Sequence, residues 1–242
     1  MQATEIATAN FDRHLVHNPY PGRGLVVGRS SAGEGWLMIY WLMGRSEHSR
    51  NRRLVVDGET LRTEPVDASL VNDPSLIIYE AMMALPHCHL IGNGDHIRTI
   101  YETLQAGSCF DAALSTRERE PDAPNYTPRI SAMLDLHHPP GQLTMSILKA
   151  NVANPAYTDR TTYRPALPPA GFGMGLTTYD GDGSPLPSFS KDPLLLPCEG
   201  DIHTVLDTYW DALDADNRIA LAVKHVPADR RTSEFVVRNR YT

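Results

Sequence analysis

The sequence predicts an α+β fold with antiparallel sheets, and three observations favour this class. Apolar, strand-like segments fill both ends of the 242-residue chain. The predicted helices are few, at 96–106, 109–117 and 200–213. Strands and helices therefore do not alternate one by one, as they do in parallel sheets.

The chain is predicted to begin with a polar arm at 1–22 and to continue as one domain over 23–242. This domain is predicted to start with two hairpins. The first hairpin turns through the Ser- and Gly-rich segment 30–35, and the second turns at Asp57-Gly58, a strong tight-turn signal. The strands of these hairpins are predicted at 23–29, 36–43, 54–56 and 61–66.

The middle of the chain combines short strands with amphipathic helices. The segment 75–85 fits a strand or a helix, and Ile77, Ile78 and Tyr79 favour the strand. A strand at 87–91 ends at a Gly-Asn-Gly turn, and Asp95 then has the position of an N-cap. The helix at 96–106 stops at a glycine, and a second helix follows it.

The remaining segments are predicted to be mainly strands joined by loops. A Pro-rich stretch at 151–171 is expected to be irregular, and a Gly-, Pro- and Ser-rich stretch at 180–197 is expected to be a long loop or lid. The last two strands are expected to pair through a turn at 229–231. Strands are predicted at 129–136, 142–150, 172–179, 217–225 and 234–238.

Composition narrows the class of protein and its surroundings. With 41% hydrophobic and 21% charged residues, the chain is globular. A net charge of -7 disfavours a surface that coats nucleic acid. An odd number of widely spaced cysteines fits a reducing compartment, and no apolar run reaches the ~18 residues of a membrane span. We expect a cytoplasmic protein that binds neither nucleic acid nor membrane.

The loop at 118–130 carries the densest chemistry in the chain. Three carboxylates, Glu118, Glu120 and Asp122, precede an Asn125-Tyr126-Thr127-Pro128-Arg129 run, and prolines stiffen the backbone on both sides of Asn125. Rigid loops with polar side chains commonly hold functional sites. The alternative is a rigid surface turn with solvated charges.

Two further clusters suggest binding of an anion. Six arginines on or near the predicted hairpins are candidates for a phosphate clamp, together with the backbone amides at 30–33, or else form a solvated surface. Asn93, between two glycines ahead of a helix, offers free amides or simply makes a helix-entry turn. These arginines are Arg23, Arg29, Arg45, Arg50, Arg52 and Arg53. His87-Cys88-His89 lacks the spacing of a metal site, so we expect no metal.

Three motifs, in this order and at this spacing, resemble the archaeal-type inosine monophosphate (IMP) cyclohydrolase family with its bacterial relatives. They are the Gly22-Arg23-Gly24-Leu25-Val26-Val27-Gly28-Arg29-Ser30-Ser31-Ala32-Gly33 segment, the Gly92-Asn93-Gly94-Asp95-His96 turn, and Asn125-Tyr126-Thr127-Pro128-Arg129-Ile130. The likeness covers about residues 20–240. It implies a four-layer αββα sandwich like that of N-terminal-nucleophile hydrolases, without a processed N-terminal nucleophile.

The resemblance also implies an activity and a set of site residues. The reaction closes the ring of 5-formamidoimidazole-4-carboxamide ribonucleotide to IMP with loss of water, in purine biosynthesis, and needs no cofactor. The protein is then a hydrolase-class enzyme and, we expect, a homo-oligomer that binds a purine nucleotide. Candidates for catalysis are Glu118, Glu120, Asp122, Arg129 and Tyr79. Candidates for substrate binding are Arg29, Ser30, Arg45, Arg50, Arg53, Asn93, Gly94, Asn125 and Thr127.

One departure from the family pattern keeps alternatives open. Tyr126 is an extra residue between Asn125 and Thr127, and it can reshape the pocket. The alternatives are a related cyclic-amide hydrolase that acts on another nucleotide-like substrate and a non-catalytic nucleotide-binding protein of the same fold.

Overall fold

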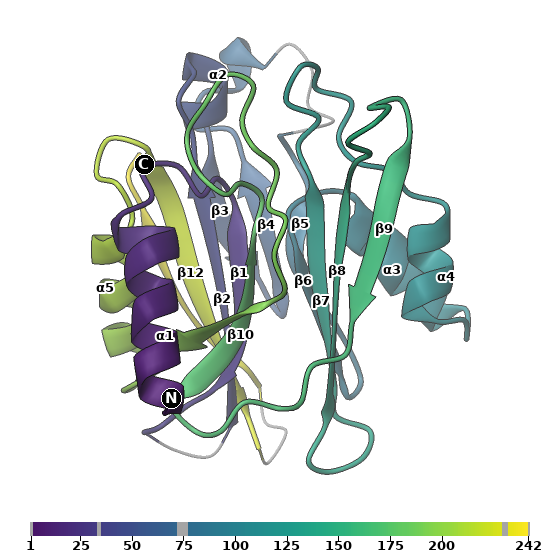
Figure 1. Ribbon diagram of the computed structural model, residues 1–242. Coiled ribbons are helices and arrows are strands. Elements are labelled where there is room, and N and C mark those ends of the chain that lie inside the picture. Colours follow the sequence, from purple (N-terminus) through teal and green to yellow (C-terminus); the bar gives the residue numbers. More distant parts are fainter. Residues whose placement is uncertain (1, 33–34, 72–76, 229–231, 242) are drawn as a thin grey trace.

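Two antiparallel sheets form the centre of the protein (Figure 1). The computed structural model describes residues 2–32, 35–71, 77–228 and 232–241. In this part of the chain the first sheet has the order β11 (Leu194–Pro197), β10 (Phe172–Thr177), β1 (Gly24–Arg29), β2 (Gly35–Met43), β12 (Arg218–Pro227), β13 (Glu234–Asn239). The second has the order β3 (Arg53–Asp57), β4 (Thr60–Glu64), β5 (Glu80–Leu85), β6 (Cys88–Gly92), β7 (Arg129–Asp135), β8 (Gln142–Ala150), β9 (Thr158–Tyr163).

Strand β2 is apolar along its whole length because both of its faces are covered. The Tyr40 hydroxyl lies 2.8 Å from that of Tyr79, next to the second sheet. Its neighbour Trp41 packs on Tyr209 of helix α5 (Ile202–Ala212), with ring centroids 6.1 Å apart. Successive strand residues point to opposite faces, so this alternation fixes which face meets which layer. Gly24 lies under Trp41, where a Cβ atom would be 1.9 Å from the indole ring.

Helices cover the outer faces of both sheets (Figure 1). Helix α1 (Ala3–Phe11) packs beside β11, and α5 packs on β12 and β13. Helix α3 (His96–Gln105) lies on β5 and β6, and α4 (Phe110–Ser115) packs on α3 and β9. The order of layers is helices, sheet, sheet, helices, which is compatible with the predicted sandwich. Short helical turns at Asp12–Val16, α2 (Glu47–Arg50) and Ala68–Leu70 complete the helical segments of the described residues.

The prediction of an α+β fold with antiparallel sheets is confirmed. The helices predicted at 96–106, 109–117 and 200–213 are present as α3, α4 and α5. The ambiguous segment 75–85 is a strand in its second half, β5, and its first two residues lie outside the described part of the chain. Also outside it lie two positions of the 30–35 turn, 33 and 34, and the turn at 229–231.

Three segments differ from the prediction. The stretch interpreted as an N-terminal arm contains α1, where Phe11 packs edge-to-face on Tyr209 at 5.2 Å. The stretch 151–171 contains the polar edge strand β9, and the loop 180–197 ends in β11. Asp95 has the N-cap position of α3 but makes no side-chain cap, because its carboxylate pairs with Arg129 and Arg117 instead.

Candidate active site

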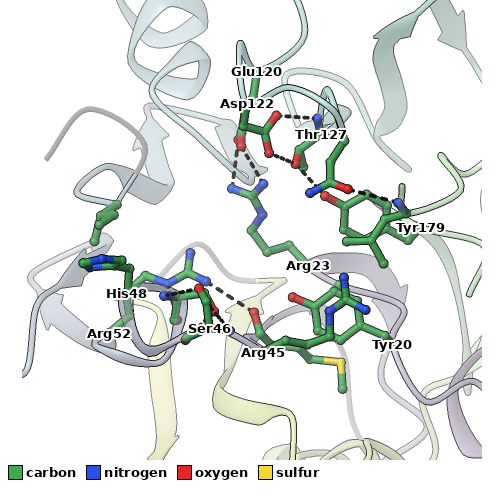
Figure 2. A pocket seen from close by; sticks show the side chains of 16 residues that line it. Tyr20, Arg23, Arg45, Ser46, His48, Arg52, Glu120, Asp122, Thr127 and Tyr179 are labelled. Atoms are coloured by element: carbon green, nitrogen blue, oxygen red, sulfur yellow. Dashed lines mark hydrogen bonds and ion pairs between the residues drawn. The ribbon is translucent and has the colours of Figure 1, made fainter. Parts of the chain in front are cut away.

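A cavity of about 480 Å³ opens at the end of the sheets where β1 begins and β2 ends (Figure 2). Strands β1 and β2 are antiparallel neighbours, so the segment before β1 and the segment after β2 lie at this same end, and the 118–128 loop before β7 of the other sheet lines the same cavity. Its lining is Tyr20, Gly22, Arg23, Met43, Arg45, Ser46, His48, Ser49, Arg52, Ile77, Glu120, Asp122, Asn125, Thr127, Tyr179 and Leu186.

A buried ion pair joins the two sheets at the floor of the cavity. Arg23 donates from Nη1 to Oε1 of Glu120 at 2.8 Å and from Nη2 to Oε2 at 2.7 Å, a two-pronged geometry that is strong for this pair of groups. The Arg23 Nη1 atom also donates to the Asn93 carbonyl at 3.0 Å. Burial raises the pKa of Glu120, while the Arg23 charge and its hydrogen bonds act in the opposite direction.

Beside this pair, Asp122, Thr127 and Tyr179 form a chain of hydrogen bonds. Asp122 accepts from the Thr127 backbone N–H at 2.7 Å and, through its other oxygen, from the Thr127 hydroxyl. The Tyr179 hydroxyl lies 2.5 Å from Thr127 Oγ1. Burial is the main reason why the pKa of Tyr179 is raised, so this phenol is neutral near pH 7.

The opposite wall of the cavity is cationic (Figure 2). Arg52 is buried, and it donates to the backbone carbonyls of Ser49 at 2.9 Å and Met43 at 3.3 Å. Among the described residues no carboxylate pairs with it. Arg45 pairs with Asp182 at the rim and lies 4.8 Å over the Tyr20 ring, and His48 is exposed beside it. A buried guanidinium without an acidic partner favours an anionic ligand.

Five of the predicted site residues do line this cavity. They are Arg45, Glu120, Asp122, Asn125 and Thr127. The side-chain oxygen of Asn125 accepts from the backbone N–H of Leu186 at 3.0 Å, and no residue in the described ranges accepts from its NH₂ group. The loop 118–130 therefore shares this cavity with Arg23, Arg45 and Arg52, and its buried Glu120 and Thr127 do not fit a solvated surface turn.

Two other predicted residues support the cavity from behind. The Asn93 side chain bridges the start of β7, accepting from Ile130 N at 2.7 Å and donating to the Pro128 carbonyl at 2.8 Å. The backbone carbonyl of Asn93, rather than its side-chain amide, contacts Arg23. The Tyr79 hydroxyl is held by that of Tyr40, and Tyr79 is buried. Neither residue lines the cavity, and Asn93 reaches it through its contact with Arg23.

A third group of predicted residues lies away from the cavity lining. Arg129 pairs with Asp95 at 2.6 Å and donates to the Glu118 backbone carbonyl at 2.8 Å, while the Glu118 side chain is exposed. Gly94 passes close to this guanidinium, because a Cβ atom there would lie 2.4 Å from Arg129 Nη1. These residues form a structural ion-pair cluster at the start of α3.

The prediction that Arg29 shares a cavity with Arg45, Arg50 or Arg53 is wrong. Arg29 and Ser30 line a different cavity, at the far end of β1, since six strand residues span roughly 20 Å. Arg50 donates to the Gly44 carbonyl at 3.2 Å, and Arg53 pairs with Glu64 at 3.2 Å. Of the arginines chosen as substrate-binding candidates, Arg45 lines the cavity described above, and Arg23 and Arg52 of the wider set of six arginines line it too.

Eleven of the sixteen lining residues were not among the chosen candidates, and Arg23, Arg52, Tyr179 and Tyr20 are four of them. Arg23 and Arg52 belong to the arginine set, but strand alternation alone does not show which end of a strand carries the site. Tyr179 follows a strand that ends beside β1, and Tyr20 precedes β1. The sequence does not show which of these distant segments pair with each other, so it did not place these residues at one site.

Two further features, a metal site and a membrane-spanning helix, are not found among the described residues. No group of three or more His, Cys, Asp or Glu side chains in the described ranges is placed to hold a metal ion. Within the same ranges no helix has the length and apolar character to cross a membrane.

Comparison with known proteins assigns the family. A search of the curated proteins found no match to the chain. The family model described as IMP cyclohydrolase-like protein matches residues 20–230, which includes both sheets apart from the last strand, and the cavity. The chain therefore belongs to the IMP cyclohydrolase-like protein family.

Proposed function

We propose that the protein is a cyclohydrolase that closes 5-formamidoimidazole-4-carboxamide ribonucleotide to IMP with loss of water. One observation carries the proposal beyond the family match. A single cavity joins a buried carboxyl–guanidinium pair, Glu120 with Arg23, to a cationic wall that holds Arg52 without an acidic partner among the described residues. Its volume of about 480 Å³ lies in the range of small-molecule sites.

Charge decides how the nucleotide lies in this cavity. The 5′-phosphate, a dianion, is placed at Arg45, Arg52 and His48, with hydroxyls of Ser46 and Ser49 nearby. The imidazole carboxamide then reaches the opposite wall with Glu120, Thr127 and Tyr179. Tyr20, whose ring stacks on Tyr179 at 5.9 Å and lies under the Arg45 guanidinium, connects this wall with the cationic one.

Ring closure needs a folded substrate and two proton transfers. The carboxamide nitrogen attacks the formyl carbon and loses one proton, the former formamido N–H loses a second, and the formyl oxygen gains both before it leaves as water. Asn125 NH₂ is free to donate to the carboxamide oxygen and hold it in the folded geometry. A well-placed acid or base contributes about 10²–10⁴ in rate.

The two carboxyl groups have environments that suit different roles. Burial raises the pKa of Glu120, which favours proton delivery to the formyl oxygen. Asp122 accepts two hydrogen bonds from Thr127, an arrangement that suits a proton acceptor. Arg23 contacts Glu120 directly, with no water between them, and its cation stabilises negative charge on the formyl oxygen in the transition state.

The remaining expectations belong to the same proposal. They are a role in purine biosynthesis, a cytoplasmic location, a homo-oligomeric state, kinship with N-terminal-nucleophile hydrolases, and catalysis without a cofactor. The order of the layers and the family match bear on the kinship and on the role in purine biosynthesis. The location, the oligomeric state and catalysis without a cofactor stay predictions.

Ultraviolet spectroscopy and chromatography of the reaction mixture test the proposal. Purified protein mixed with the formamido ribonucleotide is expected to give a product that co-elutes with authentic IMP. Binding of IMP without turnover would identify a non-catalytic nucleotide-binding protein. Failure to bind IMP and to turn over the formamido ribonucleotide would contradict the proposal and favour another substrate.

A further inference from the structure

The chain Asp122–Thr127–Tyr179 has a direction that follows from counting protons. A carboxylate has no proton to donate, so the Thr127 hydroxyl donates its only proton to Asp122. Thr127 Oγ1 must then accept in its contact with the Tyr179 hydroxyl, 2.5 Å away. Tyr179 therefore donates its proton to Thr127, and the remaining lone pair of its oxygen stays available as an acceptor.

The surroundings of Tyr179 hold this phenol at the cavity. Its ring stacks on Tyr20, and its backbone N–H donates to the Pro21 carbonyl at 3.2 Å. Gly22, whose φ of +74° suits glycine, leaves room for the ring, since a Cβ atom there would lie 2.5 Å from Tyr179 Cδ2. The ring has little freedom to move, and both Tyr179 and Thr127 line the cavity (Figure 2).

We propose that Tyr179 is the catalytic residue that takes the proton from the attacking carboxamide nitrogen and passes it through Thr127 to Asp122. This inference rests on the proposed cyclohydrolase function and adds to it a catalytic phenol and a relay. Thr127 and Asp122 act through Tyr179 and are positioning residues.

The relay balances over both halves of the reaction. As the N–C bond forms, the nitrogen proton moves to Tyr179 Oη, the Tyr179 proton moves to Thr127 Oγ1, and the Thr127 proton moves to Asp122 Oδ2. Glu120 protonates the formyl oxygen, which becomes the hydroxyl of the ring-closed adduct. The chain then runs backwards and delivers a proton to that hydroxyl, the C–O bond breaks, water leaves, and the former formamido N–H returns its proton to Glu120.

Single substitutions separate the relay from mere support of the cavity wall. Tyr179→Phe, Thr127→Val and Asp122→Asn each break one link, and Thr127→Ser is the matched control that keeps the hydroxyl. The rate of IMP formation in H₂O and D₂O is measured for each variant, together with the Kd for IMP and the thermal melting temperature.

Each of the three broken-link variants is expected to lose about 10²-fold in kcat or more, with the Kd for IMP changed by less than about threefold. The solvent isotope effect of the wild type should be larger than that of Tyr179→Phe and Thr127→Val, because several protons move together only in the intact chain. Thr127→Ser should keep both the rate, within about threefold, and the isotope effect.

Two results would overturn the relay, and they differ from each other. Thr127→Val that folds and turns over at the wild-type rate and isotope effect would remove the relay while the cyclohydrolase function stands. If Thr127→Val fails to fold, the same result for Tyr179→Phe or Asp122→Asn decides. A wild-type protein that forms no IMP would remove the cyclohydrolase function and the relay with it.

Discussion

At the scale of single residues, Glu120 combines two opposed influences on one carboxyl group. Burial raises its pKa, and the guanidinium of Arg23 counteracts this at 2.7–2.8 Å. Asp122, only two residues away, instead accepts hydrogen bonds from Thr127. One short loop thus places an acid and an acceptor side by side, as in enzymes whose two carboxyl groups have different roles.

Replacement of the acid tests this assignment. Glu120→Gln keeps the size of the side chain and one hydrogen-bond acceptor for Arg23, so the fold should persist while kcat falls by about 10²–10⁴. Wild-type turnover should also fall as the pH rises through the raised pKa of Glu120, because the acid is then deprotonated. Initial rates of IMP formation from pH 5 to 9 measure both effects. Full activity in both Glu120→Gln and Asp122→Asn would show that the loop only shapes the cavity.

At the scale of elements, helix α2 and its flanks turn three basic side chains towards the cavity. Ser46 caps the helix by accepting from Ser49 N at 3.2 Å, and Arg45, His48 and Arg52 lie around it. The loop between β10 and β11 reaches the same place through the Arg45–Asp182 pair. The phosphate end of the proposed site is therefore built from short, irregular segments rather than from strands.

A pair of matched substitutions tests the phosphate position. Arg52→Met should weaken IMP binding by about 10- to 100-fold, since a charged hydrogen bond contributes about 1.5–3 kcal/mol. It should hardly change the binding of inosine, which lacks the phosphate. Arg29→Met, in the cavity at the far end of β1, should leave the Kd for IMP unchanged. Calorimetric titration measures all three, and equal losses for IMP and inosine would place the phosphate elsewhere.

The elements also show what the sequence predicts well and where it fails. Long periodic segments such as α3, and the polar loop between prolines at 118–128, were recognisable from residue types alone. Strand β9 was missed because its residues, Thr158–Tyr163, are polar and pair with β8 on one side only, at the edge of the sheet. Helix α2 has four residues, fewer than the hydrophobic period needs.

The site was partly predictable for a related reason. Residue chemistry identified Glu120, Asp122, Asn125 and Thr127, which lie on one loop. The choice between Arg29 and Arg23 depends on which end of β1 meets this loop, and that depends on strand pairing between distant segments. Tyr179 joins the site through the same pairing, because β10 runs antiparallel to β1 and ends where β1 begins.

At the scale of the whole molecule, polar groups are buried between and beside the two sheets. Lys224 of β12 is fully buried and contacts Glu59 Oε2 at 2.8 Å, near His89 of β6. Burial, and then the charge of Lys224, lower the pKa of His89 to about 4. Burial also lowers the pKa of His14 and His96, so all three histidines are neutral in the folded protein near pH 7.

These histidines predict how stability changes with pH. Below the ordinary histidine pKa of about 6.5 the unfolded chain binds protons that the folded chain does not, so the free energy of unfolding decreases as the pH falls from about 6.5 towards 4. Circular dichroism melts at pH 7.5, 6.0 and 5.0 should show a falling melting temperature. His89→Leu should reduce the slope of this decrease, whereas an unchanged slope would show that His89 is protonated in the fold.

The proposed function places the nucleotide in the cavity between Arg52 and Tyr179. A crystal structure of the wild-type protein with bound IMP tests it most directly. We predict phosphate oxygens within hydrogen-bond distance of the Arg45 and Arg52 guanidiniums, and the purine base beside Glu120 and Tyr179. IMP bound at Arg29 and Trp36 in the far cavity, or bound in the reverse orientation with its phosphate at Arg23, would contradict the account.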